Sequence, residues 1–428
     1  MNLTQNLSDF IKSAPTAYHA VGAIAAKLKS EGATELDEKA RWTLEPGKSY
    51  YVSRSGSSLI AFRMGRKNPA ESGFMIQGAH TDSPALKARL EKLLSGKGMD
   101  RAPVEIYGGP ILSTWLDRPL ALAGRVIMKN QRGQTESRLV HTKMPIGVIP
   151  NLAIHLNRDI NKGFEYNAQT HLPVLLSASG KTEAATVSGL QKLLSEQFQI
   201  APDAILGSDL YFVDAQGPAI LGPAPELINS YRLDDLLGCH AILEAFCSTD
   251  AAEHTQVACF LDNEEIGSRT AQGADSSFLR DILSRISALQ DESPEDFYRA
   301  LAASFSISVD VAQAYHSSYP EKFDEDYAPI LNGGPAVKVN GNLKYATDGD
   351  AEAQFHLLCD TAGIPFQKFM SRADMVPGTT IGPLTSSITG IKTVDIGAPL
   401  LSMHSIRETA GILDHEYMVQ VLKRAFAG

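Results

Sequence analysis

The feature that most limits the fold of this chain is a series of short apolar runs that alternate with helical patterns. The runs FMIQ (74–77), VACFLD (257–262) and FSISVD (305–310) have the length and composition of buried strands. Apolar residues recur at helical spacing at 236–246 and at 278–289. Buried strands that alternate with amphipathic helices indicate a mostly parallel sheet covered on both faces. The sequence therefore predicts an α/β fold.

A different pattern occupies the middle of the chain. Apolar and polar residues alternate at 104–107 (VEIY) and at 120–127 (LALAGRVI), which is typical of antiparallel strands. The edges of this region are rich in Gly, Pro and charged residues, as expected where few contacts cross between domains. We therefore expect a β-rich domain of residues 90–226, inserted into a discontinuous domain of residues 1–89 and 227–428.

Charge and cysteine content exclude several classes of protein. The 428 residues include 39 Lys and Arg against 49 Asp and Glu, so the formal net charge is −10. Nucleic-acid and anionic-membrane binders need a basic surface, which this balance disfavours. The four cysteines show no CxxC spacing and are too few for a disulfide framework. The N-terminus does not have the pattern of a secretory signal, and no apolar run reaches membrane-spanning length. We expect a soluble cytoplasmic protein.

The chemistry must come from dispersed residues, because the chain has no GxxxxGK[ST], GxSxG or HExxH motif and no GxGxxG after a strand. Five places set a His, Asp or Glu at the end of an expected strand or the start of an expected helix: His80-Thr81-Asp82, Asp234-Asp235, Glu264-Glu265, Asp310 and His404. Each has a purely structural explanation when taken alone, such as a helix cap. Together they indicate a cation, because carboxylates that share a cleft resist ionisation unless a cation compensates them.

The mixture of ligand types favours zinc. Imidazoles with carboxylates suit Zn²⁺ or a similar first-row ion, whereas an all-oxygen set would suit Mg²⁺ or Ca²⁺ better. Two His with three or four carboxylates exceed the needs of one open tetrahedral zinc, and they fit two ions that share a bridging carboxylate. Asp82 lies two residues beyond His80 and is placed to accept its other ring N–H. One Glu would remain as a general base.

The same segments carry a resemblance to a known family. In chain order the chain resembles the aspartyl aminopeptidase family of dinuclear zinc exopeptidases in the motifs GAHTDSP (78–84), IPNLAIHLNR (149–158), RLDDL (232–236), DNEEIGS (262–268), GTTIG (378–382) and MHSIRE (403–408). These motifs span nearly the whole chain.

The resemblance implies a set of metal ligands. His80 is similar to the ligand of one zinc ion, Asp310 to a carboxylate on the same ion, and Asp234 to the carboxylate that bridges the two ions. Glu265 and His404 would complete the second site. The expected cofactor is therefore two divalent metal ions per chain, with Zn²⁺ as the first choice.

The resemblance also implies catalytic residues and an architecture. Glu264 would be the general base and Asp82 the residue that orients His80. Family members have a three-layer catalytic domain of the zinc-exopeptidase type, interrupted by a β-rich dimerisation domain. They assemble as tetrahedral dodecamers, so we expect a homo-oligomer.

Four further residues stand at positions that contact substrate in the family, and three of them match. Lys338 and Tyr345 match residues that line the substrate pocket, and His155 matches a histidine that reaches into the active site of a neighbouring protomer. At Gln313 the chain departs from the eukaryotic members, which have a substrate-contacting His there. Gln donates a hydrogen bond but carries no positive charge, which leaves the strictness of acidic selectivity open.

The function predicted from these residues is a metallo-aminopeptidase that removes an N-terminal Asp or Glu from peptides. Two alternatives stay open at this point. One is an aminopeptidase of broad or neutral specificity, or an amide deacylase on the same fold, because fold does not fix substrate. The other is a non-catalytic metal-binding assembly protein, against which stands Glu264 as a carboxylate beyond the needs of ligation.

Overall fold

The computed structural model describes residues 2–178, 189–290 and 293–428. It divides into two compact units. The first unit comprises residues 1–82, 218–403 and 408–428, and the second comprises residues 83–217 and 404–407. The second unit thus begins and ends somewhat earlier than the expected insertion of residues 90–226, and it takes in a short segment near the end of the chain.

A large mixed sheet organises the first unit, and its central strands are parallel. Within the described residues the strand order is β1-β2-β3-β15-β4-β16-β20-β18-β19, with parallel pairing along β15, β4, β16 and β20. The strands are β1 (Thr34–Glu35), β2 (Ser49–Arg54), β3 (Ser58–Arg63), β4 (Phe74–His80), β15 (Thr255–Leu261), β16 (Phe305–Val309), β18 (Ala336–Lys338), β19 (Gln367–Phe369) and β20 (Lys392–Gly397). The prediction of an α/β fold with a mostly parallel sheet is confirmed.

Successive residues of each central strand contribute to opposite faces of this sheet. In β15, Ala258 and Phe260 belong to one apolar core, and Val257 and Cys259 belong to the other. This follows from the two-residue period of a strand. A strand that is buried on both faces must be apolar at nearly every position, which explains the continuous apolar runs of the sequence.

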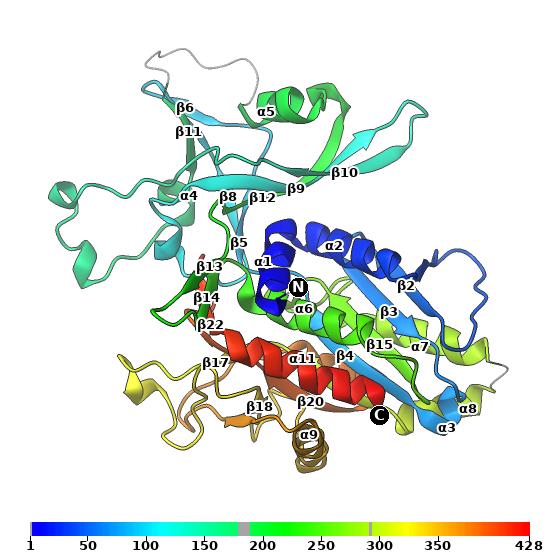
Figure 1. Ribbon diagram of the computed structural model, residues 1–428. Coiled ribbons are helices and arrows are strands. Elements are labelled where there is room, and N and C mark those ends of the chain that lie inside the picture. Colours follow the sequence, from blue (N-terminus) through cyan, green and yellow to red (C-terminus); the bar gives the residue numbers. More distant parts are fainter. Residues whose placement is uncertain (1, 179–188, 291–292) are drawn as a thin grey trace. The chain divides into compact units, whose positions relative to one another are not determined.

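Helices cover both faces, and this completes three layers (Figure 1). The first core is covered by α1 (Leu3–Ser13), α2 (Ala17–Ser30), α6 (Leu233–Cys247), α9 (Gly349–Ala362) and α11 (Ile412–Ala427). The second core is covered by α7 (Phe278–Ala288), α8 (Pro294–Ala302) and α10 (Ile381–Thr389), and α3 (Pro69–Ser72) precedes β4. A smaller sheet of this unit has the order β13-β14-β22-β21-β17 and contains β13 (Ala219–Leu221), β14 (Leu227–Ser230), β22 (Glu408–Gly411), β21 (Pro399–Leu401) and β17 (Ala312–Gln313).

The second unit is built mainly from antiparallel strands. One sheet has the order β10-β9-β12-β5-β8 and consists of β10 (Thr135–His141), β9 (Leu120–Lys129), β12 (Ile205–Asp214), β5 (Ala85–Ala88) and β8 (Val104–Tyr107). The other consists of β11 (Val174–Ala178), β7 (Met99–Ala102) and β6 (Leu94–Gly96), and the helices are α4 (Ala168–His171) and α5 (Gly189–Phe198). In the part of the chain that the structure describes, no helix combines the length and apolarity needed to cross a membrane.

Candidate metal centre and active site

The parallel strands of the first unit deliver three of the predicted site residues to one edge of the large sheet. His80 is the last residue of β4, and it pairs in register with Leu261 at the end of β15. The turn that carries Glu264 follows β15, and Asp310 follows β16. The carboxyl ends of parallel strands lie at the same sheet edge, where α/β proteins place their chemistry.

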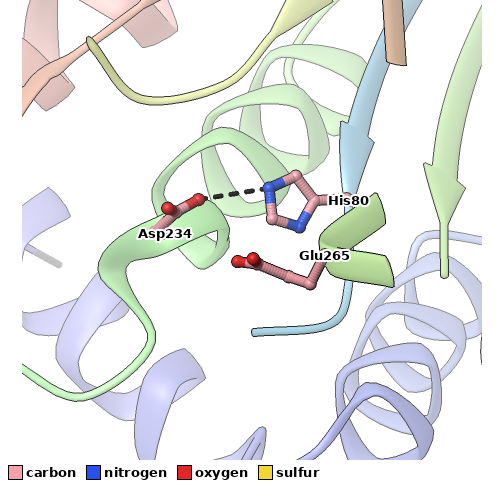
Figure 2. A group of neighbouring side chains, drawn as sticks. All are labelled: His80, Asp234 and Glu265. Atoms are coloured by element: carbon pink, nitrogen blue, oxygen red, sulfur yellow. Dashed lines mark ion pairs between the residues drawn. The ribbon is translucent and has the colours of Figure 1, made fainter. Parts of the chain in front are cut away.

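A fourth predicted residue, Asp234, comes from the start of α6. Asp234 and Asp235 are both buried, have non-helical backbone angles and are joined by a cis peptide bond. The backbone N–H of Asp234 donates a hydrogen bond of 3.0 Å to Glu408 Oε2. Asp234 Oδ1 lies 3.1 Å from His80 Nε2. Figure 2 shows the carboxylates of Asp234 and Glu265 approaching the His80 ring from two different segments.

Two groups of metal-type ligands form here, and they share His80. In the first group, atoms of His80, Asp234 and Glu265 lie within 4.8 Å of one another, and in the second the same holds for His80, Asp235 and Asp310. The distance from His80 Nε2 to Asp310 Oδ1 is 3.6 Å. One imidazole nitrogen surrounded by carboxylate oxygens is a donor set that zinc accepts. The residues present therefore fit a zinc ion.

The hydrogen bonds of His80 fix the orientation of its ring. Nδ1 lies 3.1 Å from the backbone oxygen of Asp82, and a carbonyl oxygen can only accept, so Nδ1 carries hydrogen. The lone pair of a neutral His80 is then on Nε2, which faces Asp234 and Asp310. Burial by itself would lower the pKa of His80, but hydrogen bonds to Asp234, Asp310 and Asp82 raise it well above its ordinary value.

Asp82 contacts more of the site than the sequence suggested. Its carboxylate Oδ1 is 3.5 Å from His80 Nδ1, in the direction expected for an orienting residue. The same carboxylate also accepts the backbone N–H groups of Glu264 (3.1 Å) and Glu265 (3.2 Å). Asp82 thereby connects the end of β4 to the turn that follows β15.

Glu264 and Glu265 lie in the short helical turn Glu264–Ile266. Glu265 belongs to a ligand group and Glu264 belongs to neither, among the described residues. Burial and the negative charges of Asp310, Asp82 and Asp234 raise the pKa of Glu264 to about 7, against the opposing effect of His80. A carboxylate with this pKa suits proton transfer near neutral pH.

Asp235 is a site residue to which the sequence argument gave no role. It is fully buried, Oδ2 accepts the backbone N–H of His80 (3.2 Å), and Oδ1 accepts that of Gly238 (3.1 Å). A Cβ at position 238 would lie 2.5 Å from Asp235 Oδ1, so only glycine fits there. Burial raises the pKa of Asp235 well above its ordinary value. The signal in the sequence was the second of two adjacent aspartates followed by a glycine three residues later.

The predicted substrate residues of the first unit differ in exposure. Lys338 is only 3% exposed and donates a hydrogen bond of 3.0 Å to Asp310 Oδ2. Its Nζ lies 5.5 Å from the ring centre of Tyr345, which is also buried. Burial would lower the pKa of Lys338, but the charge of Asp310 outweighs this and raises it. Gln313, the last residue of β17, is exposed.

Two predicted residues belong to the second unit. His155 is exposed in the short turn Ile154–Leu156. His404 lies in the segment 404–407, and its Nδ1 is 3.0 Å from the backbone oxygen of Gly109, which places hydrogen on Nδ1 and the lone pair of the neutral ring on Nε2. Arg407 in the same segment is buried and pairs with Asp214 at 2.9 Å. The role of His404 as a ligand stays a prediction.

Known proteins resemble this chain over nearly its whole length. Residues 10–426 match the family model of the aminopeptidase I zinc metalloproteases (M18). The chain is 44% identical to a probable M18 family aminopeptidase 2 of Pseudomonas aeruginosa (strain UCBPP-PA14), covering 99% of this chain and 98% of that protein. A similar relative from Pseudomonas fluorescens (strain SBW25) is 42% identical, with coverage of 99% and 98%.

Solved structures show the same likeness. The chain superposes on a structure described as the Ape4 and Nbr1 complex with a TM-score of 0.93 and 35% identity, covering 99% of this chain and 85% of that one. For the yeast structure described as the mApe1 dodecamer, the TM-score is 0.86, the identity is 28%, and the coverage is 99% and 96%.

Proposed function

This chain belongs to the aminopeptidase I family of zinc metalloproteases (M18), and we propose that it removes N-terminal residues, preferably Asp or Glu, from peptides by means of two divalent metal ions. The family makes the protein a metallo-aminopeptidase and a hydrolase, which sets aside the non-catalytic alternative. The acidic preference and the number of ions are the parts that we propose.

One observation supports the metal count above all others. The two ligand groups contain four carboxylates around the single imidazole of His80, which is more than one ion with an open position needs. In the proposed arrangement His80 and Asp310 would hold one ion, Glu265 and His404 would hold the second, and Asp234 would serve both. Zinc is the metal that the family description names.

The protein residues would share the chemical step as follows. When bound, the metal ions supply Lewis acidity, which polarises the scissile carbonyl and lowers the pKa of the attacking water. Glu264 accepts a proton from that water at its carboxylate and passes it to the leaving amine. Asp82 positions both His80 and the Glu264 turn through the contacts described above. His155 of a neighbouring copy is proposed to stabilise the oxyanion.

Recognition of the substrate side chain is assigned to Lys338, with Tyr345 beside it and Gln313 as a further candidate. An ammonium group that pairs with a carboxylate gives a strong, charge-assisted hydrogen bond. A second candidate function, an aminopeptidase of broad or neutral specificity, has support of its own. Lys338 already pairs with Asp310, and Gln313 brings no positive charge.

We also propose that the chain forms a homo-oligomer. The yeast relative is described as a dodecamer, and we extend that state, with tetrahedral symmetry, to this protein. The β-rich second unit would then serve dimerisation and would present His155 to a neighbour. A cytoplasmic location, with acidic peptides as substrates, completes the proposal.

The experiment that tests this function combines metal analysis with a substrate panel. Purified protein is reconstituted with zinc, and the metal per chain is measured by mass spectrometry. Hydrolysis rates are then compared for Asp, Glu, Ala and Leu amides. We expect two ions per chain and the highest kcat/KM for the acidic amides. Fewer than two ions would contradict the two-metal arrangement, and equal rates would favour the neutral aminopeptidase.

A further inference from the structure

A second buried carboxylate, Asp395, lies beside Lys338 and has no part in the site described so far. Asp395 is in β20 and is fully buried. β18 pairs antiparallel with β20, with Val337 opposite Ile396. Continuing this register by one residue places Lys338 opposite Asp395, and directly opposite residues of an antiparallel pair point to the same face.

Asp395 connects two loops that lie far apart in sequence. Its Oδ2 accepts the backbone N–H of Ala346 (2.6 Å), and its own N–H donates to Thr347 Oγ1 (2.9 Å). Its Oδ1 accepts the hydroxyl of Thr380 (2.6 Å). Tyr345, whose ring faces Lys338, immediately precedes the bonded Ala346. The carboxylate therefore fixes the backbone of the residue that forms one wall around Lys338.

The space for this carboxylate is provided by a glycine. A Cβ at Gly382 would lie 2.4 Å from both carboxylate oxygens of Asp395. Gly382 is in the first turn of α10, and Thr380 is the N-cap of that helix. The start of a helix favours negative charge, so α10 stabilises the ionised form of Asp395. Burial acts in the opposite direction and raises the pKa of Asp395, while Ser308, Thr380, Lys338 and Ala346 counteract it.

Lys338 is thus flanked by two negative charges. Asp310 pairs with it directly at 3.0 Å, and the charge of Asp395 acts on it in the same sense. Both carboxylates reduce the positive potential that Lys338 presents to the carboxylate of an incoming substrate. Asp310 is a proposed metal ligand, so its charge cannot be changed without affecting the metal site. Asp395 is therefore the carboxylate whose charge can vary independently of that site.

We propose that Asp395 is a positioning residue that determines specificity. Its charge weakens the attraction of Lys338 for acidic substrate side chains, and its hydrogen bonds hold the backbone beside Tyr345 in place. The proposal rests on the proposed function, in which Lys338 receives the substrate carboxylate. It adds a residue that has no contact with substrate or metal and that sets how strongly Asp and Glu are preferred over neutral residues.

Substitution by Asn separates the charge from the contacts. In Asp395→Asn the amide oxygen can accept from Ala346 N, and the amide nitrogen can donate to Thr380 Oγ1, which accepts as well as donates. We expect the ratio of kcat/KM for Glu-amide over Leu-amide to rise about three- to tenfold, mainly through KM, because one charge near Lys338 is removed. The inhibition constant of free glutamate should fall by a similar factor, and that of free leucine should not change.

Two further variants keep the test decisive. Asp414→Asn removes another buried carboxylate of the same unit and should leave the ratio unchanged. Asp395→Ser removes the charge with a smaller side chain, and it replaces Asp395→Asn if that protein does not fold. An unchanged or lower ratio in a folded, zinc-loaded Asp395 variant would overturn the proposal. If the wild-type protein hydrolyses Leu-amide and Glu-amide equally well and Lys338→Met changes neither rate, the failure lies in the proposed function instead.

Discussion

Three buried aspartates of the first unit and two aspartates of the second unit differ in their hydrogen-bond partners. In the first unit Asp82, Asp235 and Asp414 each accept two backbone N–H groups, which are uncharged donors. In the second unit the aspartates pair with cations: Asp209 with Lys87 and Arg125, and Asp214 with Arg407. Hydrogen bonds satisfy the oxygen atoms in both cases, but only ion pairs cancel the charge.

This difference appears in the acidity of the groups. Burial raises the pKa of Asp235, and it raises that of Asp414 to about 7. Burial acts on Asp209 as well, but Lys87 and Arg125 outweigh it and lower its pKa. Several carboxylates of the first unit gather around His80, where Lys338 pairs with Asp310. Such a concentration of negative charge attracts metal cations. In the second unit, Asp209 and Asp214 are compensated by their own ion pairs.

The largest expected effect distinguishes Glu264, the proposed general base, from Glu265, the proposed metal ligand next to it. Glu264→Gln should retain zinc, because Glu264 lies outside both ligand groups, yet lose about 10²- to 10⁴-fold in kcat with the loss of proton transfer. Steady-state kinetics with metal analysis on the same sample measure both. The matched variant Glu265→Gln should lose metal. Near-normal hydrolysis by Glu264→Gln would disprove its role as base.

A pair of variants tests the contrast between the units directly. Asp235→Asn cannot accept from both His80 N and Gly238 N, so it should weaken zinc binding about 10- to 100-fold, as changes behind metal ligands do. Asp209→Asn in the second unit should lose about 1–2 kcal/mol of stability and leave zinc affinity unchanged. Competition with a chelator gives the affinities, and urea unfolding gives the stabilities. If Asp235→Asn and Asp209→Asn changed the zinc affinity equally, the proposed difference between the two units would be wrong.

The dependence of stability on pH should have opposite signs in the two units. Asp414 has a folded pKa of about 7 against an ordinary 3.8, so the native state binds its proton more tightly. Its contribution therefore falls as pH rises from about 4 to 7, by at most about 1.4 kcal/mol per pH unit. Asp209 has a lowered pKa, so its contribution is present above its ordinary pKa and lost only in stronger acid.

Urea unfolding between pH 5 and 8 distinguishes the two cases. The stability difference between wild type and Asp414→Asn should change over this range, whereas the difference between wild type and Asp209→Asn should stay constant. A constant difference for Asp414→Asn would show that its carboxyl group is already ionised at pH 5 in the folded state.

The smallest expected effect concerns Lys338, the cation that faces the proposed metal ligands. Lys338→Met should lower kcat/KM for Asp- and Glu-amides about tenfold more than for Leu-amide, because a charge-assisted hydrogen bond to the substrate is lost. The substrate panel measures this ratio. An equal loss on all substrates would assign Lys338 to Asp310 alone, as a counter-charge for a ligand.

The sequence predicted the large sheet and the residues at its edge because both follow from short-range patterns. Apolar runs identify buried strands, and polar residues at their ends lie together once the strands are parallel. His80, Glu265 and Asp310 are close in the structure for this reason, and Asp234 joins them from the start of α6.

The sequence argument did not identify contacts that depend on the backbone of a distant segment. The sequence could not show that Asp82 accepts the N–H groups of Glu264 and Glu265. Periodicity indicates which residues are buried, but not which groups they hydrogen-bond. The same holds for Asp235 and for Asp395. Helix α1 was also absent from the expectations, although Leu7, Phe10 and Ile11 have helical spacing and Asn2 caps the helix.

The segment 404–407 has a consequence for how the chain is synthesised. The second unit has its main part in residues 83–217, yet Arg407, the partner of buried Asp214, comes near the end of the chain. This ion pair can form only after residue 407 has been synthesised, although β12, the strand that ends at Asp214, is translated almost two hundred residues earlier. The strands of this unit pair with one another within residues 83–217, so the late segment adds a buried ion pair to a sheet whose strands are already present.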